Sequence, residues 1–115
     1  MGAIVVAFLN SWRGLRHGAR TERAVRQELA LLILGVPVAL VLGATLWVKV
    51  ALVASLLLML AAEFLNTALE KLCDHLHPGR HPAIGTVKDL ASAGAFLAQM
   101  IAALVWIAAL IERLS

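Results

Sequence analysis

Three long stretches of this 115-residue sequence contain no charged residue: residues 29–48, 50–62 and 90–111. A helix needs about 20 mostly apolar residues to cross a bilayer, and the first and third stretches are long enough. The second is long enough if its helix continues past Glu63. The runs do not alternate, as the strands of a membrane β-barrel would. We therefore expect an all-α membrane protein, a single domain over residues 1–115, with transmembrane helices at about 28–47, 50–74 and 86–112 and a turn near Lys49.

The composition excludes several other classes of protein. Hydrophobic residues make up 62% of the chain and charged residues 15%. A soluble domain has roughly 45–50% and about 25%, respectively. This balance argues against a soluble globular domain and against a disordered chain. The single cysteine, Cys73, rules out an intrachain disulfide.

The N-terminal part has the pattern of an amphipathic helix, which we expect over about residues 4–26. Apolar side chains recur there at helical spacing, and arginines supply a polar side. Such a helix lies in the membrane interface. No cleavage as a signal peptide is expected, because the apolar part is short and no basic residue precedes it. The apolar set is Ile4, Val5, Phe8, Leu9, Trp12 and Leu15, and the basic set is Arg13, Arg16, Arg20, Arg23 and Arg26.

The basic residues also predict the orientation in the membrane. Five of the ten lie in residues 13–26, and Lys71, Arg80 and Lys88 flank the connection at 75–87. Only Lys49 and Arg113 lie on the other side. The positive-inside rule therefore places the N-terminus and the 75–87 loop in the cytoplasm. Anionic lipid headgroups explain the net charge of +3 better than nucleic acid does, since no recognition motif for nucleic acid is present.

One polar stripe interrupts the second apolar segment: Glu63, Asn66, Thr67, Glu70 and Asp74 share a helix face. Carboxylates on one face repel each other, so the stripe suits a divalent cation or a phosphate-bearing Mg²⁺. Structural alternatives remain open for each member, and least of all for Glu63, whose ionisable group in an apolar segment favours a functional role. Asp74 would end the helix at the headgroups, Glu70 would pair with arginine, and Asn66 would bond a neighbouring helix.

Other polar residues gather near the same membrane face. Glu22, Gln27 and Glu28 lie between the surface helix and the first span, where a solvated face with a Glu22–Arg26 pair is the alternative. Lys88 and Asp89 precede the third span, and a lysine there either binds phosphate or snorkels. A zinc site on the loop histidines His75, His77 and His81 is less favoured than an ordinary interfacial loop. Trp12, Trp47 and Trp106 are expected first as interfacial anchors.

Three separated blocks resemble the signatures of the prokaryotic diacylglycerol kinases, which are small integral-membrane lipid kinases. The first is Ser11-Trp-Arg-Gly-Leu-Arg16, then Glu22 and Arg26-Gln-Glu28; the second is Glu63-Phe-Leu-Asn-Thr-Ala-Leu-Glu70 with Asp74; the third is Lys88-Asp89 with Ala91-Ser92-Ala93. The blocks have the family's order and spacing, and the resemblance covers roughly residues 8–112.

The resemblance implies a homotrimer with active sites shared between subunits, in the bacterial inner membrane. It implies Mg²⁺-dependent transfer of the ATP γ-phosphate to the primary hydroxyl of diacylglycerol, giving phosphatidic acid. Glu63 matches the catalytic base, and Glu22 and Glu70 match the metal-binding carboxylates. The implied nucleotide-binding residues are Asn10, Glu22, Asn66, Glu70, Gly79, Arg80, His81, Lys88 and Asp89. The implied substrate-binding residues are Trp12, Arg16, Ala24, Arg26, Gln27, Glu28, Glu63, Ser92 and Trp106, and Asp74 is a further polar site residue.

Two alternatives accompany this expectation. The His81-Pro82 pair is similar to the undecaprenol kinases of the family, although the N-terminal blocks favour diacylglycerol as acceptor. A non-catalytic membrane scaffold is the second alternative, but a scaffold has no need of buried carboxylates. Among the departures from the family pattern are Leu69, Cys73 and Ala91, which are small apolar exchanges. Asn10 replaces an aromatic residue near the adenine, so stacking on the base is in doubt.

Overall fold

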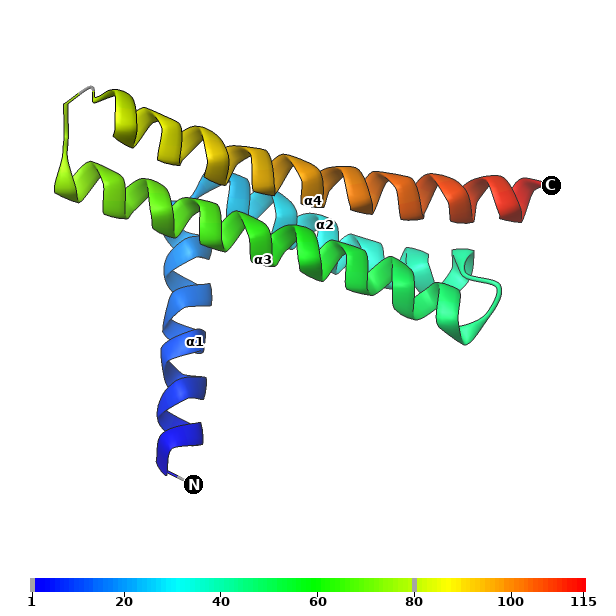
Figure 1. Ribbon diagram of the computed structural model, residues 1–115. Coiled ribbons are helices and arrows are strands. Elements are labelled where there is room, and N and C mark those ends of the chain that lie inside the picture. Colours follow the sequence, from blue (N-terminus) through cyan, green and yellow to red (C-terminus); the bar gives the residue numbers. More distant parts are fainter. Residues whose placement is uncertain (1, 80) are drawn as a thin grey trace.

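The computed structural model describes residues 2–79 and 81–115, and this part of the chain contains four α-helices and no strand (Figure 1). The helices are α1 (Gly2–Thr21), α2 (Arg23–Leu42), α3 (Leu46–Leu76) and α4 (Pro82–Leu114). The expected all-α fold is confirmed. Arg80, expected on the nucleotide side, lies outside the described residues.

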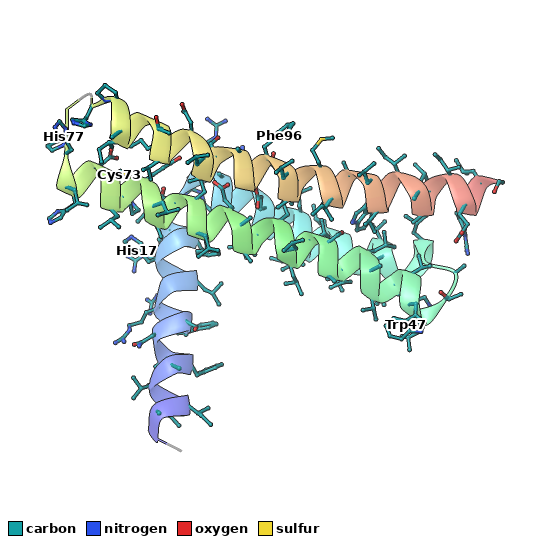
Figure 2. The ribbon with its side chains drawn as sticks, viewed as in Figure 1. His17, Trp47, Cys73, His77 and Phe96 are labelled. Carbon is teal, nitrogen blue, oxygen red and sulfur yellow. The ribbon has the colours of Figure 1, made fainter. Side chains whose placement is uncertain are left out.

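Helices α2, α3 and α4 form a bundle, and most of α1 stands apart from it (Figure 1). α3 packs along both α4 and α2. α1 contacts the bundle near its C-terminal end, where the buried Gly18 lies so close to Phe64 that a Cβ atom would come within 2.6 Å of the phenyl ring. We call the end of the bundle at which α1 joins α2, α3 ends and α4 begins the polar end. His77 and Cys73 lie toward it and Trp47 lies at the opposite end (Figure 2).

The three helices of the bundle are long and apolar enough to cross a membrane, with mean hydropathies of 1.9, 2.2 and 2.2 over their most apolar windows. α3 has 31 residues and α4 has 33. At about 1.5 Å per residue both exceed a hydrocarbon layer about 30 Å thick. Their ends therefore extend into the headgroup region or beyond. Large apolar side chains such as Ile33, Leu65 and Leu104 are exposed on the outside of the bundle, as lipid-facing residues are.

Small residues allow the close packing of α4 against α3. The buried residues of α4 are all alanines, namely Ala95, Ala98, Ala102 and Ala109. Ala102 packs with Leu56 and Met59, and Ala109 packs with Leu52 and Ala39. Small side chains of this kind let helix backbones approach closely in lipid, where burial alone does not drive association.

The turn between α2 and α3 differs from the expected position near Lys49. α2 ends at Leu42, and α3 begins at Leu46 after the N-cap Thr45, whose hydroxyl accepts a hydrogen bond from the Val48 backbone N–H at 3.3 Å. A Cβ on Gly43 would lie 2.6 Å from the Lys49 Cγ and 2.9 Å from its backbone nitrogen. The absence of a side chain at residue 43 thus sets the turn, and Lys49 lies within α3.

The other helix ends also differ from expectation. The surface helix ends at Thr21, and extended backbone at Glu22 starts α2 directly after it, so residues 23–26 belong to α2. α4 begins at Pro82, because the His81 side chain caps it by accepting a hydrogen bond from the Ala83 N–H at 3.2 Å. Proline suits a first helical position, where its missing N–H has no partner to lose.

Candidate active site

Three polar side chains are buried in the bundle toward the polar end: Glu28 of α2 and Glu63 and Asn66 of α3. Their exposed fractions are 7%, 8% and 9%. Burying ionisable groups at membrane depth is costly, so such residues mark functional sites by default. The expected site residues Glu63, Asn66 and Glu28 therefore lie in one buried layer.

Three other carboxylates lie around Glu63: Glu70 of α3, Glu28 of α2 and Glu22 at the α1–α2 junction. Glu63 lies close enough to Glu70 and Glu22 for electrostatic repulsion between ionised forms, and Glu28 is similarly close to Glu63. Glu70 itself is exposed. The structure thus brings together the carboxylates that the sequence places on α3 and near the start of α2, and the repulsion among them favours binding of a cation.

Asn66 links the buried layer to the exposed Glu70. Its side-chain N–H donates a hydrogen bond to Glu70 Oε1 at 3.2 Å. Its carbonyl oxygen Oδ1 is buried and has no hydrogen-bond partner among the described residues. A buried acceptor without a partner is unfavourable, so this oxygen is available to a ligand.

Glu22 is held at the α1–α2 junction by an ion pair with Lys71 of α3. The Lys71 Nζ lies 3.3 Å from Glu22 Oε2. The hydrogen bond from Lys71, reinforced by one from Thr21, lowers the pKa of the Glu22 carboxyl. The Glu22–Arg26 pair considered from sequence is not formed, because the Arg26 guanidinium instead donates to the Arg20 carbonyl at 3.2 Å.

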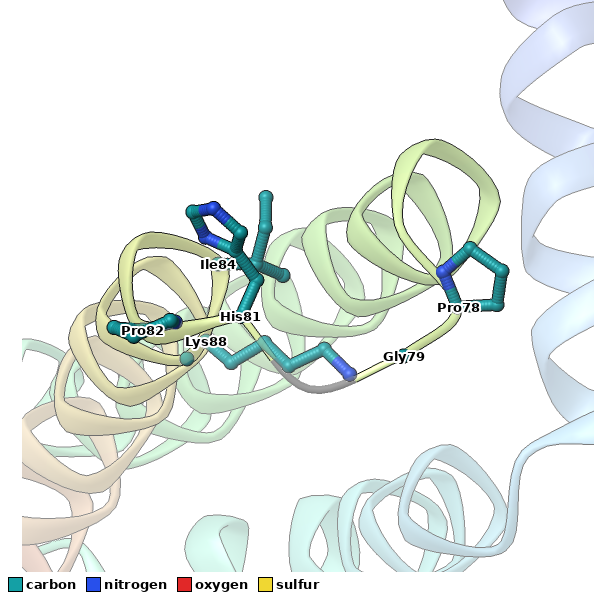
Figure 3. Close-up of a pocket in the computed structure, with 7 residues that line it drawn as sticks. Pro78, Gly79, His81, Pro82, Ile84 and Lys88 are labelled. Carbon is teal, nitrogen blue, oxygen red and sulfur yellow. The ribbon is translucent and has the colours of Figure 1, made fainter.

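A second ion pair lies at the start of α4, where Lys88 donates a hydrogen bond to Asp74 at the end of α3. Lys88 also lines a loop cavity of about 500 Å³ together with Pro78, Gly79, His81, Pro82, Ile84 and Gly85. Figure 3 shows the Lys88 side chain extended along the loop toward Gly79. This arrangement brings Gly79, His81 and Lys88, all expected on the nucleotide side, around one cavity.

Two of the loop histidines, His77 and His81, lie beside each other in the loop before α4. The rings of His77 and His81 lie 4.9 Å apart between centroids, and His77 Nδ1 lies 3.2 Å from the Gly79 carbonyl oxygen. Over residues 2–79 and 81–115, no three His, Cys, Asp or Glu side chains are arranged as ligands of one metal ion. The zinc alternative therefore has no support in the described part of the chain.

An apolar groove of about 450 Å³ lies between α2, α3 and α4 beside the buried polar layer. Leu31 follows Glu28 by three residues, and Met59 precedes Glu63 by four, so the groove lies on the bilayer side of both carboxylates. It is lined by Leu31, Leu34, Gly35, Val38, Leu56, Met59, Gln99, Ala102, Ala103 and Trp106.

Trp106 lies in this groove and not at the end of its helix. It is half-buried, and its indole N–H donates to the Leu52 carbonyl at 3.2 Å. Trp106 is therefore held against α3 and is not a free side chain on the outside of the bundle, and its role on the substrate side stays a prediction. Trp47 is exposed at the first turn of α3, as an anchor would be.

Gln99 of α4 belongs to the site but was not identified from the sequence. Its side-chain N–H donates to Glu28 Oε2 at 3.4 Å. The signal in the sequence is that Gln99 carries the only amide side chain in the charge-free stretch 90–111.

Several other expected site residues are exposed or only half-buried in the single chain. Asn10, Trp12 and Arg16 are exposed on the part of α1 that stands apart from the bundle (Figure 1), and Asn10 accepts a hydrogen bond from Arg13. Arg26, Gln27, Asp89 and Ser92 are exposed toward the polar end, and Ala24 is half-buried there.

Comparisons with known proteins identify the family of this chain. Residues 9–110 match the family model of prokaryotic diacylglycerol kinase. The chain is 34% identical to the diacylglycerol kinase of Escherichia coli strain K12 over 103 residues, covering 90% of this chain and 84% of that protein. It is 35% identical to the Haemophilus influenzae diacylglycerol kinase over 96 residues, covering 84% and 81%, respectively. It is 32% identical to the Pseudomonas aeruginosa diacylglycerol kinase over 105 residues, covering 91% of this chain and 80% of that protein.

A buried carboxylate layer beside an apolar groove, on helices fit to cross a membrane, is what an enzyme acting on a lipid headgroup requires. The family match covers nearly the whole chain, including every helix of the bundle. The chain therefore belongs to the prokaryotic diacylglycerol kinase family and is a membrane-embedded lipid kinase.

Proposed function

We propose that the protein transfers the γ-phosphate of ATP to the primary hydroxyl of diacylglycerol, giving phosphatidic acid, with Mg²⁺ as the metal ion. The observation that carries the proposal is the position of Glu63, buried between an apolar groove and a polar, carboxylate-rich end. A lipid hydroxyl arrives from the bilayer and ATP arrives from water. Glu63 lies on the boundary at which the two would meet.

Glu63 is suited to act as the general base. Its carboxylate would accept the proton of the lipid hydroxyl while the hydroxyl oxygen forms a bond to the γ-phosphorus and the bond to ADP breaks. Phosphoryl transfer depends mostly on alignment and on neutralisation of charge, so one well-placed base suffices beside phosphate-binding groups.

The residues on the phosphate side fit Mg²⁺. Glu22 and Glu70 offer carboxylate oxygens, and Asn66 Oδ1 is a buried oxygen without a partner. Mg²⁺ prefers oxygen ligands and commonly uses only one or two protein carboxylates together with substrate phosphates. When bound, the ion would neutralise phosphate charge. Lys88 would add a point charge from the loop cavity once phosphate replaces Asp74 as its partner.

The proposed assembly is a homotrimer in which subunits share active sites. The isolated chain leaves Asn10, Trp12 and Arg16 of α1 away from its own Glu63. Residues of that helix would contribute to a site only if they reached the site of a neighbouring copy. This placement supports the shared-site arrangement, and crosslinking of single-cysteine variants between α1 and α3 in a background without Cys73 would test it.

The proposed orientation places the polar end in the cytoplasm of a bacterium, across the inner membrane. Eight of the ten lysines and arginines occur in residues 13–26 or flank the 75–87 connection. Basic residues of this kind remain on the cytoplasmic side. ATP is available on that side, so orientation and substrate supply agree.

The test is a phosphate-transfer assay on the full-length chain in detergent micelles. Dioleoylglycerol and undecaprenol are offered side by side with γ-labelled ATP, with Mg²⁺ or with excess EDTA. We expect Mg²⁺-dependent label in phosphatidic acid and little in undecaprenyl phosphate. The His81-Pro82 pair has a structural role in this chain, because His81 is the N-cap of α4 and Pro82 its first residue. Label in undecaprenyl phosphate alone would overturn the choice of acceptor, and label in neither lipid would overturn the proposed reaction.

A further inference from the structure

Gln99 and Glu28 form the side-chain hydrogen bond that joins α4 to α2 in the described part of the chain. These two helices otherwise contact each other little, since both pack mainly against α3. Polar side chains that hydrogen-bond across helices in a membrane orient each other and contribute modestly to helix packing. The conformation of the Glu28 side chain therefore depends on Gln99.

The bond uses only one of the two Glu28 carboxylate oxygens. Gln99 donates to Oε2, while Oε1 is buried and has no hydrogen-bond partner among the described residues. Glu28 as a whole is 93% buried, given its exposed fraction of 7%. A buried carboxylate oxygen without a donor is costly, and a hydroxyl group is a donor that would satisfy it.

The same glutamine lines the apolar groove. Apart from Trp106, whose indole N–H is already bonded to α3, Gln99 is the polar residue among the groove's lining residues. The groove leads away from Glu28 and Glu63 along the apolar part of the bundle, so an acyl chain in it would end at these two carboxylates. Gln99 therefore lies at the junction between the space for a chain and the groups for a hydroxyl.

We infer that Gln99 is a positioning residue for the acceptor lipid: by holding Glu28 Oε2 it leaves Oε1 free to accept a hydrogen bond from the lipid hydroxyl as the lipid binds. That single proton then passes to Glu63 when the hydroxyl oxygen attacks the γ-phosphorus, so Glu28 acts in binding and Glu63 in the chemical step. This inference rests on the proposed function, since it assigns a role in binding the same acceptor. It adds a residue on α4 that contributes to lipid affinity through Glu28, without a direct part in the chemistry.

The test uses full-length Gln99→Met, which keeps the size of the side chain and removes its amide. We expect the KM for dioleoylglycerol to rise about tenfold, as loss of one hydrogen bond to a charged group predicts. The KM for ATP should stay unchanged, because Gln99 does not line the loop cavity. If Gln99→Met fails to fold, Gln99→Asn replaces it, because the asparagine side chain is too short to reach Glu28. It should likewise raise the KM for dioleoylglycerol and leave the KM for ATP unchanged. Leu104→Phe on the exposed face of α4 is the matched control and should change neither KM.

An exchange variant separates positioning from simple structural support. Glu28→Gln/Gln99→Glu restores an amide–carboxylate bond between the helices but moves the carboxylate to α4. We expect it to recover thermal stability without recovering the KM for dioleoylglycerol. The inference is overturned if Gln99→Met and Gln99→Asn both keep the wild-type lipid KM, or if the exchange variant recovers it fully. Absence of phosphate transfer by the wild-type chain would instead overturn the proposed function, and the inference with it.

Discussion

Lys71 of α3 lies 3.3 Å from Glu22 at the α1–α2 junction and ties that junction to the bundle. Because Lys71 lowers the pKa of Glu22, the pair stabilises the folded state at every pH above the ordinary carboxyl value of 4.5. The stabilisation is lost as the pH falls through the lowered pKa of the folded state. Both groups are solvent-accessible, so the effect is small.

Lys71→Met should therefore unfold at a slightly lower temperature than the wild-type chain at pH 7. The difference should begin to shrink as the pH falls below 4.5 and should approach zero once the pH is below the lowered pKa of Glu22 in the folded state, because Glu22 is then protonated in both states. Thermal unfolding in EDTA from pH 3 to 8 measures this without interference from Mg²⁺. A difference in unfolding temperature that grows toward acid pH would contradict the assigned pair.

Glu70→Ala should raise the Mg²⁺ concentration needed for half-maximal activity, or abolish activity. The substitution removes one proposed carboxylate ligand and leaves the Asn66 N–H without its acceptor. Titration of activity with Mg²⁺ at saturating ATP measures the change. Asp74→Ala is an informative comparison, because Asp74 bonds Lys88 and is not proposed as a metal ligand. Equal Mg²⁺ requirements in wild type and Glu70→Ala would remove Glu70 from the metal site.

Gly43→Ala should destabilise the turn between α2 and α3 by about 1–3 kcal/mol, the usual cost of overpacking. The new Cβ would lie 2.9 Å from the Lys49 backbone nitrogen, and backbone does not move aside as a flexible side chain would. Gly94→Ala is the matched control, since a Cβ there meets no atom within 4 Å apart from the neighbouring residues and backbone of its own helix. Unfolding in a denaturing detergent compares the two. Equal stability of Gly43→Ala and Gly94→Ala would show that the turn tolerates a side chain at residue 43.

The helices could be predicted from the sequence because charge-free stretches leave few alternatives in lipid. Their ends could not be predicted as well. Lys49 looked like the centre of a turn, but a charged residue near a membrane edge is compatible with a first helical turn. The steric requirement at Gly43 and the cap at Thr45 depend on how the chain folds back, which charge patterning does not describe.

In the candidate site, too, the sequence predicts the arrangement of residues within one helix but not the contacts between helices. Glu63, Asn66 and Glu70 could be placed on one face because helical periodicity alone determines it. The Lys71–Glu22 and Gln99–Glu28 contacts join residues 49 and 71 positions apart, respectively, so they depend on helix packing. The local Glu22–Arg26 pair was the natural sequence-based alternative, and tertiary contacts displaced it. Gln99 could not be predicted as a site residue, because a single glutamine hardly changes the apolar character of its segment.

Glu63→Gln should lose most turnover while the protein still folds and assembles. The amide has the size and hydrogen-bonding atoms of the carboxyl, so packing around this buried position is preserved, but an amide does not accept a hydroxyl proton. Loss of a general base typically costs about 10²–10⁴-fold in rate. Glu112→Gln is the matched control: Glu112 is the acidic residue at the far end of α4, exposed and distant from the polar end. Steady-state kcat, with thermal unfolding and size measured in the same micelles, tests the prediction. Because a metal ligand would respond to Mg²⁺ concentration and a base would not, the loss in Glu63→Gln should persist at saturating Mg²⁺. Recovery of turnover by added Mg²⁺ would assign Glu63 to the metal site instead, and wild-type turnover would exclude it from both roles.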